Sequence, residues 1–308
     1  MTPSFSRSCG RDKSRDGVIQ NSHHYYTPMP TRIAVISGTS SGFGLLATIE
    51  LARRGCRVVA SMRDLGRREG LDQAAAAAGV TSQLDVRRLD ITDFDSIPAF
   101  VDGVARDYGH LDVLVNNAGF AVAGFAEDMQ LAEVRLQFET NFFGHVALTL
   151  SALPVMRRQG SGHIIMISSI AGLHGSFSIS SYSAAKHALE GCSESLRMEV
   201  NALGIKVVLV EPGSYETDIW TRNVVLGKKL LDGTSPNRAR GEKMKELVQK
   251  LKKRDPQEVA RLIADIAQDP SPRLRYVVGP DAHIQLWLKR LLPWTWHERL
   301  IARMMKID

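Results

Sequence analysis

The chain has 308 residues, of which 44% are hydrophobic and 23% charged, and its formal net charge is +6. This composition is typical of a globular protein that buries a full core. No apolar run reaches the roughly 18 residues that a membrane span needs, and the N-terminus lacks a basic-then-apolar secretion signal. The three cysteines lie far apart and include an odd one, which favours a reducing compartment, so we predict a cytoplasmic protein.

The pattern of the chain changes near both ends. Residues 1–30 are polar, aperiodic and rich in turn formers, which predicts a disordered leader; an upstream start-site artefact and a transit peptide are the alternatives. Strand and helix patterns alternate from 31 to 281 without a break, which indicates one α/β domain. Residues 282–308 form an amphipathic tail with three of the four tryptophans.

The first strand is predicted at 32–38 and runs into the loop SGTSSGFG at 37–44. Helical periodicity follows, and a second strand is predicted at 56–62. Strand, glycine loop and helix in this order are the context that a phosphate-binding loop requires, although a tight turn alone also uses glycines. The glycines that let this backbone turn and approach a pyrophosphate are Gly38, Gly42 and Gly44.

The end of the second strand indicates which dinucleotide binds. A ribose 2′-hydroxyl, as in NAD, usually meets a carboxylate there, but this chain has none before Asp64. Arg63 can instead pair with a 2′-phosphate, and Ser41 of the glycine loop can donate to it. The sequence therefore favours NADP over NAD; in the alternative, Arg63 is a surface residue and Asp64 turns inward to the ribose.

The alternation continues along the chain. Further strands are predicted within 82–90 and at 111–119, 162–169, 205–213 and 275–280, with helices at 96–109, 131–158 and 181–203. These make about seven parallel strands between helices. The sequence therefore predicts a doubly wound Rossmann-type α/β fold with helices on both faces of the sheet.

Two segments are predicted at the carboxyl edge of this sheet, where ligands of open α/β sheets bind. The sequence NNAG at 116–119 ends the fourth strand, although Asn and Gly also build ordinary turns. Asp90 ends the third strand, and it can accept a hydrogen bond from an adenine amino group or cap the next helix.

Tyr182 and Lys186 are four residues apart on the helix predicted at 181–203, so they share one face. A tyrosine with a pKa near 10 is a poor acid–base catalyst at neutral pH, and a nearby ammonium lowers that pKa. Tyr182 is then a candidate to give a proton to a carbonyl or take one from an alcohol, while Lys186 keeps donors for a ribose. Ser168 and Ser169 close the preceding strand, where a hydroxyl can hold the substrate oxygen.

Together these motifs resemble the short-chain dehydrogenase/reductase family. The glycine loop, NNAG, an assisting asparagine, a serine, the YxxxK pair and a PG turn occur in the family's order, and the resemblance covers about residues 32–215. The serine at the family's distance from the tyrosine is Ser169, and Asn141 in TNFFGH matches the assisting asparagine. The glycine loop begins Ser37-Gly38 where the family usually has Thr-Gly, which keeps a hydroxyl.

The resemblance implies an NAD(P)-dependent oxidoreductase in which a hydride passes between the nicotinamide and a carbonyl carbon while Tyr182 moves the proton. It also implies that Asn141 holds a water that relays protons from Lys186; a hydrogen bond that fixes a helix is the alternative. The catalytic residues expected are Asn141, Ser169, Tyr182 and Lys186. The cofactor-binding residues expected are Gly38, Ser40, Ser41, Gly42, Phe43, Gly44, Arg63, Asp90, Asn117, Ala118, Gly119, Tyr182, Lys186, Pro212, Gly213 and Thr217, and no metal is expected.

The sequences after Tyr182 and at 58–64 look most like the hydroxysteroid and retinol dehydrogenase branch, which implies a bulky apolar alcohol or carbonyl substrate of steroid, retinoid or fatty type. The resemblance also implies that the variable segment that forms much of the substrate pocket is 214–254. Side chains that suggest an apolar pocket, or an ordinary core, are Phe177, Ile179, Tyr215, Ile219 and Trp220. The alternatives are a 3-oxoacyl-thioester reductase and a non-catalytic NADP-sensing regulator, which would be expected to lack Tyr182, Lys186 or Ser169.

Charge and the tail indicate further contacts. Basic residues outnumber acidic ones between 222 and 254, which we interpret as a solvated helical face rather than a nucleic-acid site, because no aromatic residue there can stack on a base. An anionic substrate and a membrane surface are the alternatives. Pro293 predicts two helices in the tail, which we expect to cover the substrate pocket or a second subunit, with peripheral membrane contact as the alternative. A homodimer or homotetramer is expected.

Overall fold

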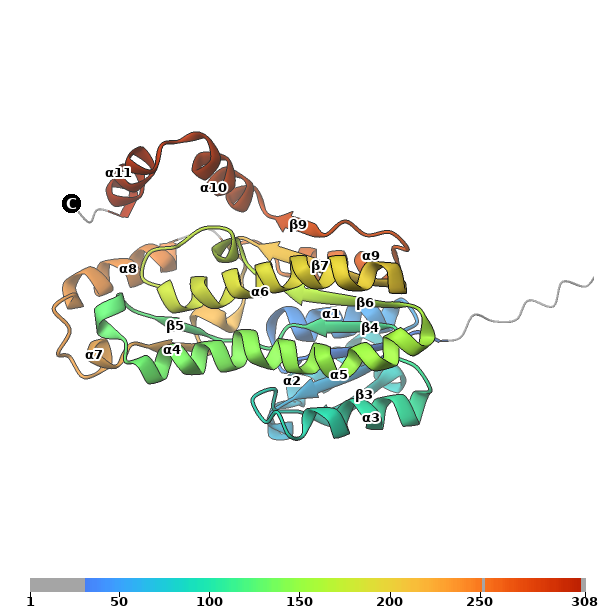
Figure 1. Ribbon diagram of the computed structural model, residues 1–308. Helices are drawn as coiled ribbons and strands as arrows, with labels where there is room; N and C mark the ends of the chain where they lie inside the picture. The colour runs from blue at the N-terminus through green and yellow to red at the C-terminus, as the bar shows by residue number, and fades with distance from the viewer. Residues whose placement is uncertain (1–30, 251–252, 306–308) are drawn as a thin grey trace, which may run out of the picture. The chain divides into compact units, whose positions relative to one another are not determined.

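A computed structural model describes residues 31–250 and 253–305, so the leader predicted at 1–30 lies outside the described residues. The described chain contains a seven-stranded parallel sheet (Figure 1). Its strands are β1 (Ile33–Ser37), β2 (Arg57–Met62), β3 (Leu84–Arg88), β4 (Val113–Asn116), β6 (Gly162–Ile167), β7 (Ile205–Pro212) and β9 (Arg275–Val278). Their order is β3-β2-β1-β4-β6-β7-β9. Strands β2 and β3 are added on one side of β1, and the later strands are added on its other side, beginning with β4. Ligands of such sheets bind outside the carboxyl ends of the strands at this change of side, between β1 and β4.

Helices cover both faces of the sheet, which confirms the predicted fold. They are α1 (Gly42–Arg53), α2 (Glu69–Ala78), α3 (Ile97–Tyr108), α5 (Gly144–Gln159), α6 (Ser180–Val200) and α9 (Gln257–Gln268). Successive side chains of a strand point to opposite faces. In β1, Ala34 and Ile36 therefore join a core with α1, α2 and α9, whereas Ile33 and Val35 join a core with α3, α5 and α6.

The helical stretch predicted at 131–158 is not one continuous α-helix. A π-helical turn, Glu139–Phe143, separates α4 (Leu131–Phe138) from α5. The wider π turn changes which side chains face the interior, and it places Asn141 where its exposed fraction is 0%. Periodicity alone does not reveal such a turn, because the apolar pattern continues on both sides of it.

The segment 214–254 contains two short elements that the sequence did not predict and one largely exposed helix, which agrees with the solvated helical face expected within 222–254. They are β8 (Val224–Leu226), α7 (Lys228–Leu231) and α8 (Arg238–Lys250). β8 pairs in parallel with β5 (Ala121–Ala123), so this segment is joined to the chain that follows the NNAG turn.

The tail forms α10 (Pro280–Leu291) and α11 (Trp294–Met305), with the break at Pro293 as predicted. Proline lacks the N–H that would continue the helix, and it begins a new helix well. Within residues 31–250 and 253–305, the helices are too short or too polar to cross a membrane.

Candidate active site

The glycine loop joins β1 to α1 through conformations that favour glycine. Gly38 has a φ of +74° and Gly42 a φ of +58°, both in the left-handed region. A Cβ on Gly38 would lie 2.6 Å from Cα of Ala118, and one on Gly44 would lie 2.2 Å from the carbonyl oxygen of Gly38. The backbone around this loop is therefore so closely packed that a side chain at Gly38 or Gly44 would clash with it.

The N-terminus of α1 is suited to an anion. The first-turn amides of a helix have no intrahelical acceptor, and the Ser41 side chain does not cap them. Ser40 and Ser41 are half-buried beside these amides. The ring of Phe43 packs edge-on against Tyr215, with 5.7 Å between centroids, so its side chain belongs to the core.

Ser37 and Asn117 bind the glycine loop to the end of β4. Asn117 Nδ2 donates to the carbonyl oxygens of Ser37 at 2.9 Å and Gly38 at 3.0 Å. The Ser37 hydroxyl accepts hydrogen bonds from the amides of Asn117 at 3.0 Å and Ala118 at 3.1 Å. The NNAG segment is thus more than an ordinary turn, and a hydroxyl at position 37 is needed to hold it.

Arg63 and Asp64 follow β2 at the same edge of the sheet. Both are exposed, and Asp64 Oδ1 accepts a hydrogen bond from the amide of Gly66 at 2.9 Å. Among the described residues, Arg63 has no ion-pair partner. The Asp64 carboxylate caps its own turn, whereas the Arg63 guanidinium remains available to a ligand.

Asp90 does not cap the next helix, because Ser96 is the residue that precedes α3. Its Oδ1 instead accepts hydrogen bonds from the amide of Thr92 at 3.0 Å and the Thr92 hydroxyl at 2.7 Å. The helix-cap alternative is therefore wrong, and the proposed role toward an adenine stays a prediction.

Tyr182, Lys186 and Ser169 meet between β6 and α6. Tyr182 and Lys186 are each 4% exposed, and Nζ of Lys186 lies 5.8 Å from the centroid of the Tyr182 ring. The Ser169 side chain interacts with the Tyr182 hydroxyl and accepts a hydrogen bond from the amide of Ala171 at 3.1 Å. Ser168 is buried, and its Oγ lacks a hydrogen-bond partner within the described chain. The structure thus places Ser169, rather than Ser168, at the phenol.

The protonation of this group differs from the sequence prediction. Burial raises the pKa of Tyr182 to about 12, and the hydrogen bond with Ser169 acts in the opposite direction but is weaker. Burial lowers the pKa of Lys186 to about 8, whereas Glu190 raises it. The sequence predicted a lowered pKa for Tyr182, but burial raises it in this structure, and Lys186 is not among the causes of the shift.

Asn141 and His145 support the segment after β4. Asn141 Nδ2 donates to the carbonyl oxygen of Phe120 at 3.0 Å, and its Oδ1 accepts from the Phe120 amide at 3.3 Å. His145 Nε2 lies 2.7 Å from the carbonyl oxygen of Ala118. Burial lowers the pKa of His145 to about 3, so the neutral ring donates this hydrogen bond. Sequence reasoning missed His145, although its position one turn after Asn141 was visible.

The PG turn at the end of β7 is held by a residue in the first turn of α10. Asp281 Oδ2 accepts a hydrogen bond from the amide of Ser214 at 2.7 Å, and a Cβ on Gly213 would lie 2.5 Å from the Asp281 carboxylate oxygens. A Cβ on Gly42 would lie 3.7 Å from Cβ of Thr217, so this turn leads back to the glycine loop. Sequence reasoning missed Asp281 because nothing in the local sequence indicates this contact.

Apolar side chains adjoin Tyr182 on the side of the 214–254 segment. Ile179, Ile219 and Trp220 pack against the small buried cluster that contains Tyr182, with 5.7 Å between the centroids of the Tyr182 and Trp220 rings. Phe177 instead packs edge-on against Phe125, 5.3 Å between centroids, and the Arg240 guanidinium covers both rings.

For Tyr215 the structure favours the second alternative, an ordinary core position, over the apolar pocket. Tyr215 is 3% exposed, belongs to the core beside α1 and α9, and donates a hydrogen bond to Glu258 Oε2 at 3.0 Å.

A partly buried ion cluster lies one turn beyond Lys186 on α6, and sequence reasoning missed it. Arg275 of β9 contacts the carboxylates of Glu190 and Glu194 on α6 and of Glu211 on β7. Burial raises the pKa of Glu211 to about 7. Glu190 lies one turn after Lys186, which was a visible signal, but its meeting with Arg275 depends on the strand order.

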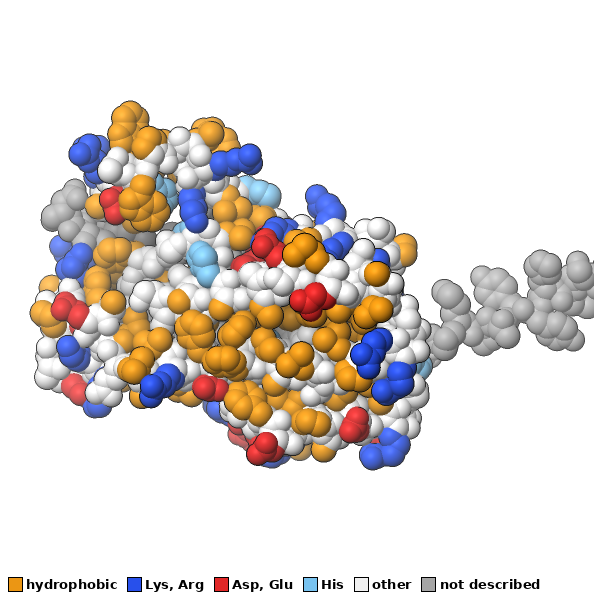
Figure 2. Space-filling model, viewed as in Figure 1, with side chains coloured by type: hydrophobic (Ala, Val, Ile, Leu, Met, Phe, Trp, Pro, Cys, Tyr) orange, Lys and Arg blue, Asp and Glu red, His pale blue; other side chains and the backbone are white. Residues whose placement is uncertain are grey.

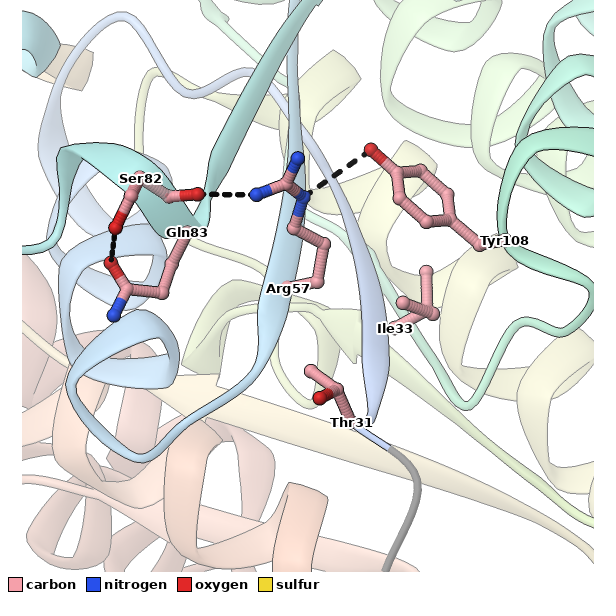
Figure 3. A pocket seen from close by; sticks show the side chains of 6 residues that line it. All are labelled: Thr31, Ile33, Arg57, Ser82, Gln83 and Tyr108. Carbon is pink, nitrogen blue, oxygen red and sulfur yellow. Dashed lines mark hydrogen bonds between the residues drawn. The ribbon is translucent and has the colours of Figure 1, made fainter.

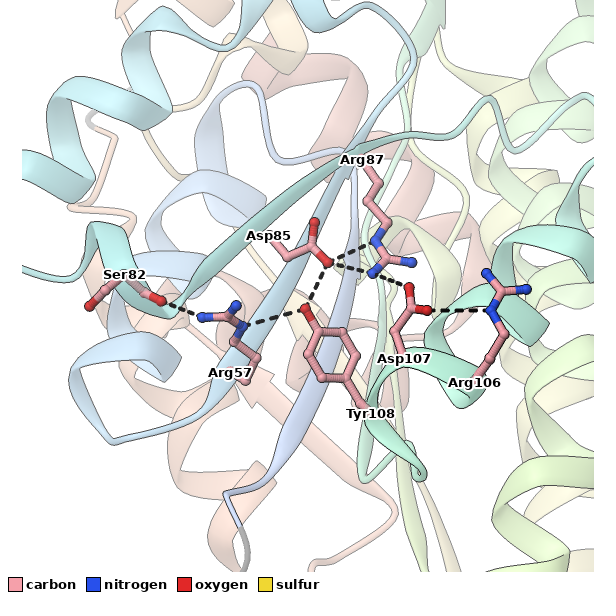
Figure 4. Close-up of polar contacts among 7 residues, drawn as sticks. All are labelled: Arg57, Ser82, Asp85, Arg87, Arg106, Asp107 and Tyr108. Carbon is pink, nitrogen blue, oxygen red and sulfur yellow. Dashed lines mark hydrogen bonds and ion pairs between the residues drawn. The ribbon is translucent and has the colours of Figure 1, made fainter.

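A cavity of about 330 Å³ lies at the opposite edge of the sheet (Figure 3). It is lined by residues at the starts of β1, β2 and β3. Arg57 bonds there to the carbonyl oxygen of Ser82 and, at 3.4 Å, to the Tyr108 hydroxyl. The same tyrosine joins an ion network with Asp85 and Arg87 (Figure 4). This cavity lies at the amino ends of the strands, whereas Tyr182 lies at their carboxyl ends, so the two are separate.

Known proteins resemble the chain over most of its described length. A family model described as short chain dehydrogenase matches residues 32–224. An uncharacterised oxidoreductase of Bacillus subtilis is 41% identical over 89% of this chain and 99% of that protein. Human retinol dehydrogenase 8 is 42% identical over 61% of this chain and 60% of its own length.

Solved structures show the same architecture. A short-chain dehydrogenase from Streptomyces avermitilis has a TM-score of 0.74 and 32% identity, covering 87% of this chain and 97% of that one. A metagenomic short-chain oxidoreductase in complex with NADP has a TM-score of 0.64 and 27% identity, covering 81% of this chain and 96% of that one.

Proposed function

The chain belongs to the short chain dehydrogenase family and is an oxidoreductase of alcohol and carbonyl groups, and we propose that it transfers a hydride between NADP and a bulky apolar alcohol or carbonyl compound. One observation carries the proposal. Tyr182, Lys186 and Ser169 meet at the carboxyl edge of the sheet, the edge that also carries the glycine loop. A non-catalytic regulator has no need of this group.

The residues at this edge fit a nicotinamide dinucleotide. The glycine loop and the uncapped first turn of α1 would hold the phosphates, because their amides are donors and the helix dipole favours negative charge. Lys186, the NNAG segment, Pro212-Gly213 and Thr217 would hold the nicotinamide half. Asp90 would hold the adenine.

The preference for NADP rests on the residues after β2. Arg63 is exposed and carries a guanidinium suited to bidentate binding of a 2′-phosphate. Asp64, which would serve the ribose of NAD, is engaged by the amide of Gly66. Ser41 would act with Arg63, because the glycine loop is joined to the end of β2 by hydrogen bonds from the amides of Gly38 and Thr39 to the carbonyl oxygen of Ser61.

The chain's own groups move the proton. The bound cofactor supplies or accepts a hydride at the substrate carbon. Because burial keeps the Tyr182 phenol protonated at neutral pH, its O–H is set to donate to the substrate oxygen in the direction of reduction. Ser169 Oγ holds the substrate oxygen. Lys186 stays close to the Tyr182 ring because its Nζ donates a hydrogen bond to the carbonyl oxygen of Ile167. In oxidation the phenolate form of Tyr182 would take the proton from the alcohol, which restores the phenol. We further propose that Asn141 belongs to the proton path.

The substrate side is apolar. Ile179, Ile219 and Trp220 next to Tyr182 favour a steroid, retinoid or fatty compound over a small polar one. The likeness to human retinol dehydrogenase 8 supports the same substrate class.

The test is oxidation of NADPH and of NADH by the purified protein with steroids, retinal, aliphatic aldehydes and 3-oxoacyl thioesters. We expect turnover with NADPH and a bulky apolar carbonyl compound. Turnover confined to 3-oxoacyl thioesters would replace the proposed substrate class, and faster turnover with NADH would replace the cofactor. Binding of NADPH without turnover of any compound would contradict the enzymatic proposal.

We also propose a homodimer in the cytoplasm. Exposed apolar side chains gather over α4, α5 and α6, where Figure 2 shows a broad hydrophobic area in the centre of the view. The exposed large apolar side chains of these helices and of the π-helical turn include Leu136, Phe143, Leu150 and Met198. Such a face favours a second copy of the chain. Light scattering after size-exclusion chromatography tests this, and Leu150→Glu with Met198→Glu is expected to give a monomer.

A further inference from the structure

The tail helices carry an apolar surface that the described chain leaves uncovered. Its members, which we call the tail stripe, are Ile284, Trp287, Leu291, Trp294 and Trp296. Each is between 56% and 63% exposed. Ile284, Trp287 and Leu291 recur every three or four residues, so they share one side of α10. A hollow of about 350 Å³ is lined by His283, Ile284 and Trp287 on the same helix.

Positive charge surrounds the tail stripe. Lys289, Arg290, Arg299 and Arg303 are exposed on α10 and α11, and Figure 2 shows basic side chains among the apolar ones at the top of the view. In residues 253–305, Arg290, Arg299 and Arg303 make no ion pair. The two acidic residues of these helices are engaged, since Asp281 accepts from the Ser214 amide and Glu298 from Trp294 Nε1 at 2.8 Å.

The tail stripe is held in place by the domain. His174 Nε2 lies 2.6 Å from Gln285 Oε1, and Lys289 Nζ donates to the carbonyl oxygen of Leu173. Both partners lie in the segment between Ser169 and Tyr182. One side of α10 therefore contacts the segment before Tyr182, while the other side presents the stripe outward; that the tail covers the substrate pocket or a second subunit stays a prediction.

We propose that α10 and α11 form a peripheral binding surface for an anionic lipid bilayer. Tryptophan prefers the boundary between headgroups and acyl chains, and Lys and Arg next to it attract anionic headgroups. Amphipathic helices with this combination lie in the plane of the interface.

A second copy of the chain fits this surface less well than lipid does. A two-fold pair through the tail stripe would bring the same basic residues of both copies together without acidic partners. The apolar area over α4, α5 and α6 lacks this concentration of charge and is the better site for a second copy. Lipid binding by α10 and α11 does not depend on the proposed substrate, because binding to a bilayer requires no turnover.

The test is co-sedimentation of the intact protein with vesicles. We expect binding to vesicles of phosphatidylglycerol and phosphatidylcholine in equal amounts, and binding at least about tenfold weaker to phosphatidylcholine alone, because several basic residues lie at the surface. The variant Ile284→Ser, Trp287→Ser, Leu291→Ser should lose binding to both kinds of vesicle. The variant Arg290→Glu, Arg299→Glu, Arg303→Glu should lose the preference for anionic vesicles.

Matched controls separate this surface from general basicity. Lys243→Glu with Lys245→Glu changes exposed charges on α8 and should leave vesicle binding nearly unchanged. Thermal unfolding and NADPH binding of every variant establish that the domain is folded. Brominated lipids should quench tail tryptophan fluorescence in a Trp220→Phe background, which places the tail stripe at acyl-chain depth.

Three outcomes overturn the proposal. Wild-type protein that stays in the supernatant with anionic vesicles excludes a lipid surface. If the α8 variant loses as much vesicle binding as the Arg290, Arg299 and Arg303 variant, the binding comes from the overall positive charge of the protein. A serine variant that binds vesicles normally but changes from dimer to monomer assigns the tail stripe to a second copy.

Discussion

Nζ of Lys186 donates a 2.7 Å hydrogen bond to the carbonyl oxygen of Ile167, the last residue of β6. This bond ties α6 to the carboxyl end of the sheet and holds the ammonium 5.8 Å from the centroid of the Tyr182 ring. The position of Lys186 is therefore set by the protein itself. Burial lowers its pKa to about 8, so its charge is sensitive to nearby carboxylates.

Tyr182→Phe should abolish turnover and preserve cofactor binding, because it removes only the hydroxyl that moves the proton. The rate should fall by about 100- to 10,000-fold, the range for a general acid or base. Steady-state kinetics and NADPH fluorescence titration measure the two effects. Tyr108→Phe removes a phenol hydroxyl at the opposite edge of the sheet and is the control. Retention of more than a tenth of the rate in Tyr182→Phe excludes it as the proton donor.

Glu190→Gln should move the pH profile of kcat/KM toward lower pH. Glu190 raises the pKa of Lys186 against the effect of burial, so its loss lets Lys186 lose its proton at lower pH. Glu194 contacts the same Arg275, but it is not a cause of the Lys186 shift, so Glu194→Gln is the matched control. An identical profile in both variants would show that Glu190 acts on stability alone.

Arg63→Ala should weaken NADPH binding by about 1.5–3 kcal/mol, the scale of a charge-assisted hydrogen bond. NADH binding should barely change, because NADH has no 2′-phosphate. Isothermal titration with both cofactors measures this, and Arg67→Ala, exposed on the same segment, is the control. Equal loss for the two cofactors means that Arg63 does not recognise the 2′-phosphate.

Gly44→Ala should prevent cofactor binding and lower the melting temperature. The added Cβ would lie 2.2 Å from the Gly38 carbonyl oxygen and 2.4 Å from Asn117 Nδ2, so the loop must open. Gly191→Ala is the contrasting control, because a Cβ there meets nothing within 4 Å on an exposed turn of α6. The control should gain about 0.5–1 kcal/mol of helix stability. Normal NADPH binding by Gly44→Ala would contradict the assignment of this loop.

Asp85 should contribute to stability at neutral pH and lose that contribution in acid. Burial alone would raise the pKa of Asp85, but hydrogen bonds from Arg87 and Tyr108 outweigh it and lower the pKa. A carboxyl whose pKa is lower in the folded state stabilises the fold above its unfolded pKa, and this is lost as pH falls through the folded pKa. Asp85→Asn should therefore lower the free energy of unfolding at pH 7 and flatten its decrease in acid. Denaturation in urea at several pH values measures this, with exposed Asp102→Asn as the control. Parallel pH curves for wild type and Asp85→Asn would refute it.

The sequence by itself determined the elements that carry the candidate site. Strand, glycine loop and α1 follow from local periodicity and from glycines at Gly38 and Gly42 whose positive φ few other residues adopt. The four-residue spacing of Tyr182 and Lys186 places both on one helical face without the help of any tertiary contact. The order of the motifs likewise indicated the family, because chain order is a property of the sequence.

Only the tertiary structure decided the environment of these residues. The pKa of Tyr182 rises because the whole fold removes the phenol from water, which no spacing reveals. Asp281 reaches Ser214, and Arg275 reaches Glu190 and Glu211, through contacts across many residues of chain that depend on strand order. Packing likewise decides which side of α10 faces outward. An amphipathic pattern shows that an apolar face exists, but it does not show which surface that face contacts.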